Sequence, residues 1–235
     1  MIIKVCGMRE ADNIRDVAQL GIDWLGLDFR PGSPRFVRQV SSRAGIIPDY
    51  GCFGKILKPG EEQDALCGKV RMCGVFADDM PQNIITRVVN YSLDMVQLNG
   101  SESGVMIDNL RRTLDPDIRP GILIVKTLPL SSEADLAKCR EYTGHADYFL
   151  FEVKASATLD SREAADWRLL EAYEGDVPFL LGGSIGPEDA EAIRSLSHPR
   201  FVGVDVNAGF EVGPAVKNLE TLVPFVQALR KQPAY

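Results

Sequence analysis

Short apolar, β-branched runs alternate along the chain with longer amphipathic segments. The apolar runs predict eight strands, at 2–6, 24–29, 70–76, 95–98, 122–127, 148–152, 178–181 and 201–206. The amphipathic segments predict helices at 10–20, 81–91, 102–114, 132–142, 167–173, 187–196 and 215–230. Pro81 and Pro187 suit the first turn of a helix, and Ser132 three residues before Asp135 is typical of a capping box.

The stretch after the second predicted strand breaks this alternation. Residues 36–47 are compatible with a helix, whereas 50–68 are glycine-rich and irregular, which indicates a loop or an insertion. No linker divides the chain, so we expect residues 1–235 to form one domain.

Eight strands that alternate with helices predict a parallel sheet covered by helices. Strands that are apolar throughout fit burial on both faces. An open doubly wound sheet usually has fewer units, and no GxGxxG follows the first strand. The pattern therefore favours an α/β fold, a single (β/α)₈ TIM barrel, in which chemistry belongs at the carboxyl ends of the strands.

Composition narrows the function classes. The net charge of −7 argues against a nucleic-acid partner but allows a small phosphorylated ligand, because backbone N–H groups can hold phosphate. Five cysteines without a CxxC pair and only two histidines make a zinc site or a disulfide framework unexpected. No signal peptide and no apolar run of about 20 residues is present, so we expect a cytoplasmic protein without a membrane partner.

The first strand ends on Cys6, which is either a small buried apolar residue or a reactive thiol at the barrel mouth. Lys4 lies on the same face of the strand, where it either favours a thiolate or forms an ion pair inside the barrel.

Polar residues also follow the second, fourth and sixth strands. Arg35 leaves a turn fixed by prolines and suits a carboxylate, although a solvated loop arginine fits equally well. Gln97 and Asn99 contact either substrate or neighbouring side chains. Glu152 ends the sixth strand, either as a working acid or as an ordinary charge at a strand end.

The turns after the seventh and eighth strands are rich in glycine. Loops seven and eight are the usual phosphate site of (β/α)₈ enzymes, and glycine lets the backbone approach a ligand. We therefore expect a phosphate to bind between Gly182, Gly183 and Ser184 in one turn and Asn207, Ala208 and Gly209 in the other. Asp205, just before the second turn, is a further candidate for substrate binding.

Six stretches together carry a family resemblance: KVCGM, SPRFV, CGVFAD, VQLNG, GGSIGP and GVDVNAGFE. In this order and spacing, over nearly the whole chain, they resemble phosphoribosylanthranilate isomerase of tryptophan biosynthesis. The resemblance implies an Amadori rearrangement of N-(5-phosphoribosyl)anthranilate on a TIM barrel, without cofactor or metal. It also implies that Cys6 is the base, that Glu152 stands at the position of the acid, and that Arg35 holds the anthranilate carboxylate. Whether the protein is a monomer or a homodimer is left open.

Four features depart from that family's pattern. Glu152–Val153 replaces an Asp-Thr pair, and Leu159–Asp160–Ser161–Arg162 replaces a glycine-rich loop that closes over the substrate. Asn99 replaces a histidine, and Gly182–Gly183–Ser184 replaces Ser-Gly-Gly. Two hypotheses follow: a diverged isomerase that uses Glu152 as its acid, or a barrel that binds a phosphosugar without this activity or acts on another phosphosugar. We expect the loop at 153–165 to close poorly, because residues other than glycine resist positive φ.

Overall fold

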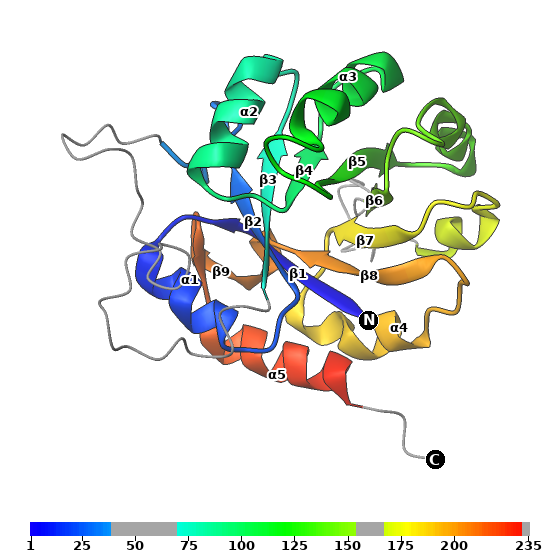
Figure 1. Ribbon diagram of the computed structural model, residues 1–235. Coiled ribbons are helices and arrows are strands. Elements are labelled where there is room, and N and C mark those ends of the chain that lie inside the picture. The colour runs from blue at the N-terminus through cyan, green and yellow to red at the C-terminus, as the bar shows by residue number, and fades with distance from the viewer. Residues whose placement is uncertain (39–69, 154–166, 232–235) are drawn as a thin grey trace.

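Eight parallel strands form a closed barrel in the order β1 to β8 (Figure 1). The computed structural model describes residues 1–38, 70–153 and 167–231. The strands are β1 (Ile2–Met8), β2 (Trp24–Asp28), β3 (Arg71–Phe76), β4 (Met95–Leu98), β5 (Leu123–Leu130), β6 (Tyr148–Val153), β7 (Phe179–Gly183) and β8 (Phe201–Val206). The predicted (β/α)₈ barrel is confirmed, and each predicted strand is present, with ends that differ by at most three residues.

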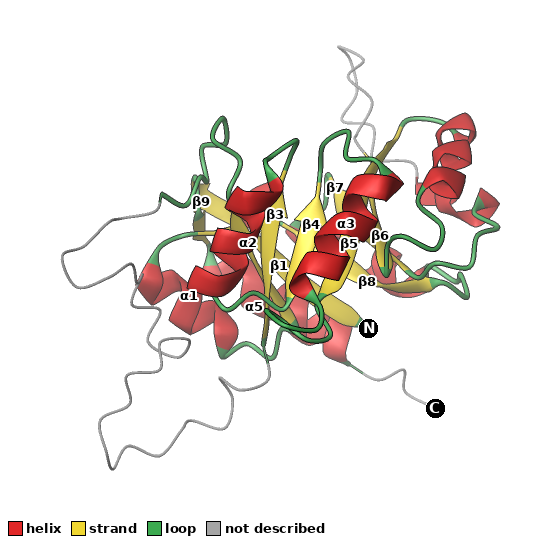
Figure 2. Cartoon of the chain, turned by 45° about the horizontal axis from the view of Figure 1, so that its top comes forward, coloured by secondary structure: helices red, strands yellow, loops and turns green. Residues whose placement is uncertain are grey.

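Helical segments cover the outside of the barrel (Figure 2). The α-helices are α1 (Ala11–Ala18), α2 (Pro81–Asn90), α3 (Gly104–Leu114), α4 (Ala190–Ser195) and α5 (Leu219–Arg230). The 3₁₀ segments are η2 (Glu133–Glu141), η3 (Trp167–Ala172), η4 (Pro187–Asp189) and η5 (Ala208–Phe210). The capping box of Ser132 and Asp135 is confirmed, but the turn that it starts is 3₁₀ and not α-helical. No helix in the described residues is long and apolar enough to cross a membrane.

The predicted helix at 215–230 is wrong in its first four residues. Glu211–Gly213 (β9) and Val216–Lys217 (β10) pair as a small antiparallel hairpin, and α5 begins only at Leu219. Ala215 has a φ of 68°, which a helix does not accommodate. The Asn218 side chain accepts a hydrogen bond from the Glu220 N–H and so starts the helix there.

Between β2 and β3, the structure describes residues 29–38 and residue 70. Phe36 forms a parallel bridge with Asp28, so no helix begins at residue 36. The remainder of the predicted helix at 36–47 and the predicted loop at 50–68 lie outside the described residues.

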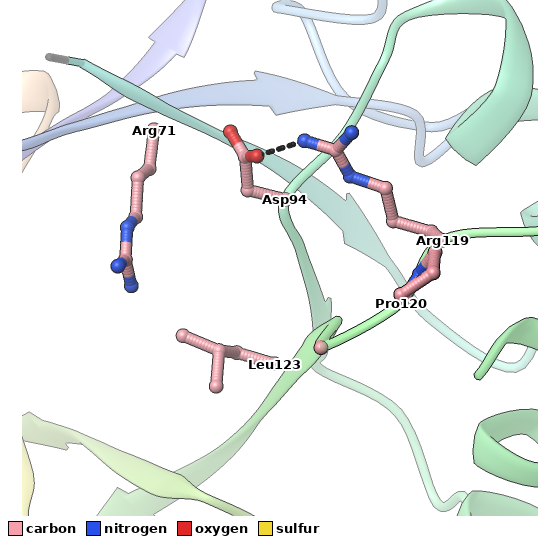
Figure 3. A pocket seen from close by; sticks show the side chains of 6 residues that line it. Arg71, Asp94, Arg119, Pro120 and Leu123 are labelled. Atoms are coloured by element: carbon pink, nitrogen blue, oxygen red, sulfur yellow. Dashed lines mark hydrogen bonds and ion pairs between the residues drawn. The ribbon is translucent and has the colours of Figure 1, made fainter. Parts of the chain in front are cut away.

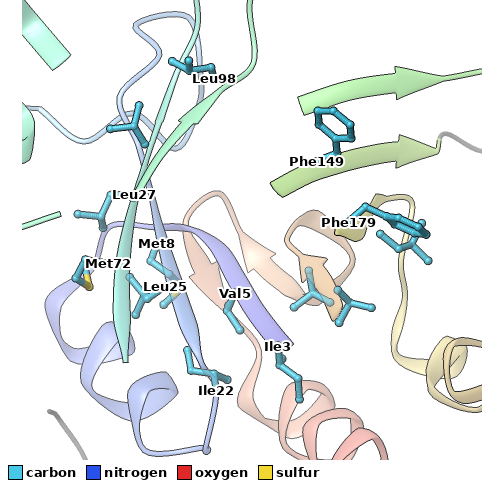
Figure 4. Close-up of a cluster of buried hydrophobic side chains, with 14 of the residues drawn as sticks. Ile3, Val5, Met8, Ile22, Leu25, Leu27, Met72, Leu98, Phe149 and Phe179 are labelled. Atoms are coloured by element: carbon cyan, nitrogen blue, oxygen red, sulfur yellow. The ribbon is translucent and has the colours of Figure 1, made fainter. Parts of the chain in front are cut away.

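Strand alternation separates two apolar clusters. Residues such as Ile3 and Val5 face outward and pack in the large cluster that the helices cover (Figure 4). Their neighbours in sequence face the barrel lumen, which a second cluster fills. Its fully buried members are Trp24, Cys73, Met95, Val125, Leu150 and Leu180. These six fill the lumen from its middle toward the amino ends of the strands. The part of the lumen nearest the carboxyl ends of the strands, called the upper part here, is left to polar residues, and it opens at the mouth of the barrel.

Aromatic rings support one side of the barrel. Phe179 is completely buried on the outer face of β7, and its ring centroid lies 4.9 Å from that of Phe151 and 5.4 Å from that of Tyr173. We expect Phe179→Ala to lower the free energy of unfolding by about 3–5 kcal/mol, because it leaves a cavity in a close-packed core. Denaturant unfolding followed by circular dichroism measures the loss.

The control is Val212→Ala at an exposed position of β9, which should change the free energy of unfolding by less than about 0.5 kcal/mol. Equal effects of the two substitutions would contradict the proposed packing role of Phe179.

Candidate active site

Polar and charged side chains occupy the upper part of the barrel lumen. They lie on the inward faces of the strands, two residues apart where a strand supplies more than one. They are Lys4 and Cys6 on β1, Asp28 on β2, Gln97 on β4, Thr127 on β5, Glu152 on β6 and Asp205 on β8. All but Glu152 are buried, and Glu152 is partly exposed. This arrangement brings the predicted site residues of four strands to one end of the barrel.

Lys4 forms an ion pair inside the barrel. Its Nζ lies 2.9 Å from Asp205 Oδ2 and also donates a hydrogen bond to Gln97 Oε1. Burial works against the ammonium, but the charge of the Asp205 carboxylate and its hydrogen bond to Lys4 help to outweigh it, and the pKa of Lys4 is raised. Lys4 is therefore cationic, as the ion-pair interpretation predicts. The other oxygen of the carboxylate, Asp205 Oδ1, is buried without a hydrogen-bond partner in the described residues.

Cys6 faces the lumen against the backbone of β2. A Cβ atom at Gly26 would lie 2.6 Å from the Cys6 sulfur, so glycine is required there for the thiol to fit. Burial raises the pKa of Cys6 to about 11. Lys4 opposes this rise, while the carboxylates of Asp205 and Asp28 add to it. Cys6 is therefore a neutral thiol at pH 7. When it loses its proton, the nearby Lys4 ammonium stabilises the thiolate.

Gln97 and Asn99 belong to a side-chain network that crosses from β4 to β5. Gln97 Nε2 donates to Asn99 Oδ1 at 2.7 Å and to Thr127 Oγ1 at 3.1 Å. The Thr127 hydroxyl in turn donates to Asn99 Oδ1 at 2.6 Å. Since Asn99 Oδ1 accepts both bonds, its amide N–H groups are directed away from the network. The structural interpretation of Gln97 is thus confirmed, and contact with a substrate stays a prediction.

Arg35 is held rigidly above the mouth. Its Nε and Nη2 donate to the two carboxylate oxygens of Glu211 at 2.8 and 2.6 Å. The same carboxylate accepts from Lys217 Nζ at 2.7 Å. Arg35 also lies directly over Gly7, which has a φ of 71° and no room for a Cβ. The alternative of a solvated loop arginine is wrong, because the guanidinium is fixed and only 19% of the side chain is exposed.

A second arginine near the mouth was not found from the sequence. Arg30 makes a two-pronged ion pair with Asp28, with Nε 2.9 Å from Oδ1 and Nη2 2.7 Å from Oδ2. Asp28 is almost fully buried at the end of β2. The signal in the sequence is an aspartate inside an apolar run, two residues before an arginine in the turn. Glu211 and Lys217 were missed as well, because only the fold brings them to Arg35.

Glu152 lies on the lumen face of β6, two residues beyond the buried Leu150. It pairs in register with Gly182 of β7, whose missing side chain leaves space beside Leu150 and Asp205. The predicted loop at 153–165 lies outside the described residues beyond Val153.

The turns after β7 and β8 meet, as predicted. Gly209 packs directly on the carbonyl of Ile185, so closely that no Cβ fits. The N–H of Ser184 donates to Val153 O at 3.2 Å and that of Gly186 to Asp189 at 2.6 Å, so both are already in use. The N–H groups of Ala208 and Gly209 start the short η5 turn and make no hydrogen bond within the described residues. Phosphate binding at this junction stays a prediction, with η5 as the better donor.

A cavity of about 260 Å³ lies at the opposite end of the barrel, at the starts of β3, β4 and β5 (Figure 3). Arg119 pairs with Asp94 along its wall, and Arg71 lies on its other side. In (β/α)₈ enzymes this end serves stability rather than chemistry. Among the described residues, no group of three or more His, Cys, Asp or Glu side chains is placed to hold a metal ion.

Comparisons with known proteins agree with this geometry. A family model described as N-(5'phosphoribosyl)anthranilate (PRA) isomerase matches residues 60–228. A protein of Parabacteroides distasonis named N-(5'-phosphoribosyl)anthranilate isomerase is 38% identical over 231 residues, which cover 97% of this chain and 93% of that protein. A protein of the same name from Phocaeicola vulgatus is 32% identical over 232 residues, 99% of each chain.

Solved structures share the fold. The crystal structure of phosphoribosyl anthranilate isomerase from Thermus thermophilus superposes with a TM-score of 0.72 at 24% identity, over 97% of this chain and 98% of that one. A phosphoribosyl anthranilate isomerase in complex with reduced 1-(o-carboxyphenylamino)-1-deoxyribulose 5-phosphate gives 0.71 at 21% identity, over 98% and 99%.

The ion pair of Lys4 generates one prediction. Lys4→Met should lower the free energy of unfolding by about 3–5 kcal/mol, because it leaves the Asp205 carboxylate buried without a counter-charge. Chemical denaturation at neutral pH measures this. Lys138→Met is the matched control. It breaks an exposed ion pair with Asp135 and should cost less than about 1 kcal/mol. A small loss for Lys4→Met would show that Asp205 does not need this partner.

The thiol generates another prediction. With a pKa of about 11, Cys6 should react with iodoacetamide about tenfold faster for each unit of pH from 7 to 10, because only the thiolate reacts. Peptide mass spectrometry follows Cys6 separately from the other cysteines. A rate that levels off below pH 9 would mean that Lys4 dominates over burial.

Proposed function

The chain belongs to the N-(5'-phosphoribosyl)anthranilate isomerase family, and on this premise we propose that it converts N-(5-phosphoribosyl)anthranilate to the carboxyphenylamino-deoxyribulose phosphate by an Amadori rearrangement, as a step of tryptophan biosynthesis. The observation that carries the proposal is the placement of Cys6 and Glu152. They face one lumen from β1 and β6, at the same end of the barrel.

The reaction needs one acid and one base. We assign Glu152 as the acid that donates its proton to the ring oxygen of the ribose, so that the bond between C1 and this oxygen breaks and a protonated Schiff base forms. Cys6, as the thiolate, removes the proton from C2, and the resulting enolamine rearranges to the ketone. The proton gained by the thiol matches the proton given by the acid, so the sequence is balanced overall.

The lumen favours this role for Cys6. Proton abstraction requires the thiolate, and Lys4 supplies the positive charge that stabilises it against burial. Since Lys4 is itself fixed by Asp205 and Gln97, that charge is in place before a substrate enters. Preorganised charge of this kind lowers the barrier without reorganisation during the reaction.

The remaining site residues suit the two anionic ends of the substrate. Arg35 has donors left for the anthranilate carboxylate. The η5 turn offers the phosphate the N–H groups of Ala208 and Gly209, which have no acceptor among the described residues, opposite Gly182, Gly183 and Ser184. The unpartnered Asp205 Oδ1 suits a ribose hydroxyl.

The proposal also covers the domain organisation, the cellular location and the partners of the protein. We infer that residues 1–235 form one barrel domain that acts in the cytoplasm on a small soluble substrate, with no nucleic-acid or membrane partner and without cofactor or metal. The net charge of −7 supports the absence of a nucleic-acid partner.

We expect the purified protein to isomerise N-(5-phosphoribosyl)anthranilate formed in solution from anthranilate and a phosphoribosyl donor. Cys6→Ala and Glu152→Gln should each lower kcat by at least about a hundredfold while KM changes little, because a proton-transfer group acts mainly in the transition state. Product fluorescence follows the reaction.

Cys139→Ala is the control, since Cys139 is a buried thiol of η2 outside the barrel. It should leave kcat unchanged. An inactive wild-type protein would favour the alternative, a barrel that binds a phosphosugar or acts on another one. Full activity of Cys6→Ala would remove Cys6 from the mechanism.

A further inference from the structure

Asp28 ties together the loop that carries both arginines of the mouth. Its Oδ1 accepts from the Arg30 backbone N–H at 3.0 Å as well as from Arg30 Nε. Its backbone carbonyl accepts from the Val37 N–H at 2.8 Å. Both ends of the loop are therefore fastened to one residue of β2, with Arg35 between them. A loop held in this way keeps its guanidinium groups in fixed positions.

Arg30 lies at the mouth of the barrel, where its guanidinium is bonded to the lumen-facing carboxylate of Asp28. Its hydrogen bond with Asp28 raises the pKa of Arg30 against the effect of burial, and the charges of Cys6 and Glu152 raise it further. Cys6 is on the strand next to β2, whereas Glu152 is on β6, four strands away in a ring of eight. The bonds to Asp28 therefore place this guanidinium on the β2 side of the mouth, on the same loop as Arg35.

The bonds of Arg30 leave a recognition edge open. Asp28 occupies Nε and one N–H of Nη2, so both N–H groups of Nη1 and the second of Nη2 have no acceptor among the described residues. Glu211 occupies the same edge of Arg35 and leaves the same donors. Two arginines in one mouth thus each retain the end of the guanidinium that binds a carboxylate in two-pronged fashion.

Stability alone does not account for the pair of Asp28 and Arg30. Removing charges from water costs about as much as a buried ion pair returns, so such a pair rarely adds net stability over apolar residues of similar size. Asp28 interrupts an otherwise apolar strand, and 35% of the Arg30 side chain is exposed at the mouth. An apolar residue in place of Arg30 would not supply the exposed N–H donors of Nη1 and Nη2, so binding of a ligand by these donors explains the pair better than stability does.

We propose that Arg30 is a further specificity-determining residue, which binds the carboxylate of the substrate's aryl amine together with Arg35, and that Asp28 is the positioning residue that holds it there. The proposal rests on the proposed function, because that function supplies a substrate with an aryl carboxylate. It adds a second guanidinium to the single arginine that the family resemblance implies.

The test compares a substrate with the carboxylate and a ligand without it. KM is measured for N-(5-phosphoribosyl)anthranilate, and the inhibition constant for N-(5-phosphoribosyl)aniline as a competing ligand. Arg30→Gln should raise KM about 10- to 100-fold, the loss expected for a charge-assisted hydrogen bond, and leave the inhibition constant of the aniline compound unchanged. Arg30→Lys keeps the charge but loses the fork and should fall between wild type and Arg30→Gln.

Arg9→Gln is the matched control. Arg9 donates to the Pro34 carbonyl of the same loop at 3.1 Å but belongs to neither ion pair of the mouth. It should change neither constant. Thermal unfolding of all variants shows that the loss in KM does not come from a destabilised barrel.

Three outcomes overturn the proposal. One is an unchanged KM in Arg30→Gln. Another is an equal loss of affinity for both compounds, which would make Arg30 a structural support of the site. The last is a lower kcat with both constants unchanged, which would assign Arg30 to proton transfer and not to recognition. Inactivity of the wild-type protein is seen before any variant is compared, and it refutes the proposed function as well.

Discussion

The barrel closes on an ion pair. β1 and β8 are the first and last strands of the barrel, and in their pairing Lys4 lies directly opposite Asp205. Their side chains meet in the lumen, and the same ammonium reaches Gln97 on β4. The charge pair therefore fixes the register of the closing strands, since a shift of either strand by one residue would turn its charge out of the lumen and leave the other charge buried without a partner. Cys6 follows Lys4 by two residues and Asn207 follows Asp205 by two, so this register also places the Cys6 thiol and the η5 turn.

The upper lumen balances almost every charge locally. Asp205 neutralises Lys4, Asp28 neutralises Arg30, and Glu211 serves both Arg35 and Lys217. Burial lowers the pKa of Lys217 even though Glu211 opposes it, and the two cations keep the pKa of Glu211 below its usual range against burial. These groups lose their water and form their ion pairs during folding. The N–H donors of Arg30 and Arg35 that the ion pairs do not use are therefore already oriented before a substrate binds. An anionic substrate then enters a site whose fixed charges need little rearrangement.

Local pattern was sufficient to predict the strands and their order. Near-continuous apolar runs of the right length identified all eight, and the motifs at their ends identified Cys6, Arg35 and Glu152. Partners remote in sequence were not predictable, because Arg35 and Glu211 are 176 residues apart and nothing local to either one indicates the other. The helical segments were also harder: η2 and η3 have the composition of helices but are 3₁₀, and the hairpin before α5 depends on the positive φ of Ala215.

The substitution of glutamate for the family's aspartate at residue 152 has a physical counterpart in Arg30. A glutamate carboxyl reaches one methylene farther from its strand than an aspartate carboxyl does, and Arg30 is bonded to the lumen-facing Asp28 of β2, four strands away in the ring. Under the proposed function, Arg30 and Arg35 hold the aryl carboxylate on the β2 side of the mouth, and Glu152 acts on the ribose ring from the β6 side. The aryl ring and the ribose of the substrate would then span the mouth between these two strands. The fixed bonds of Arg30 to Asp28 and of Arg35 to Glu211 keep the recognition side of this arrangement in place before a substrate enters.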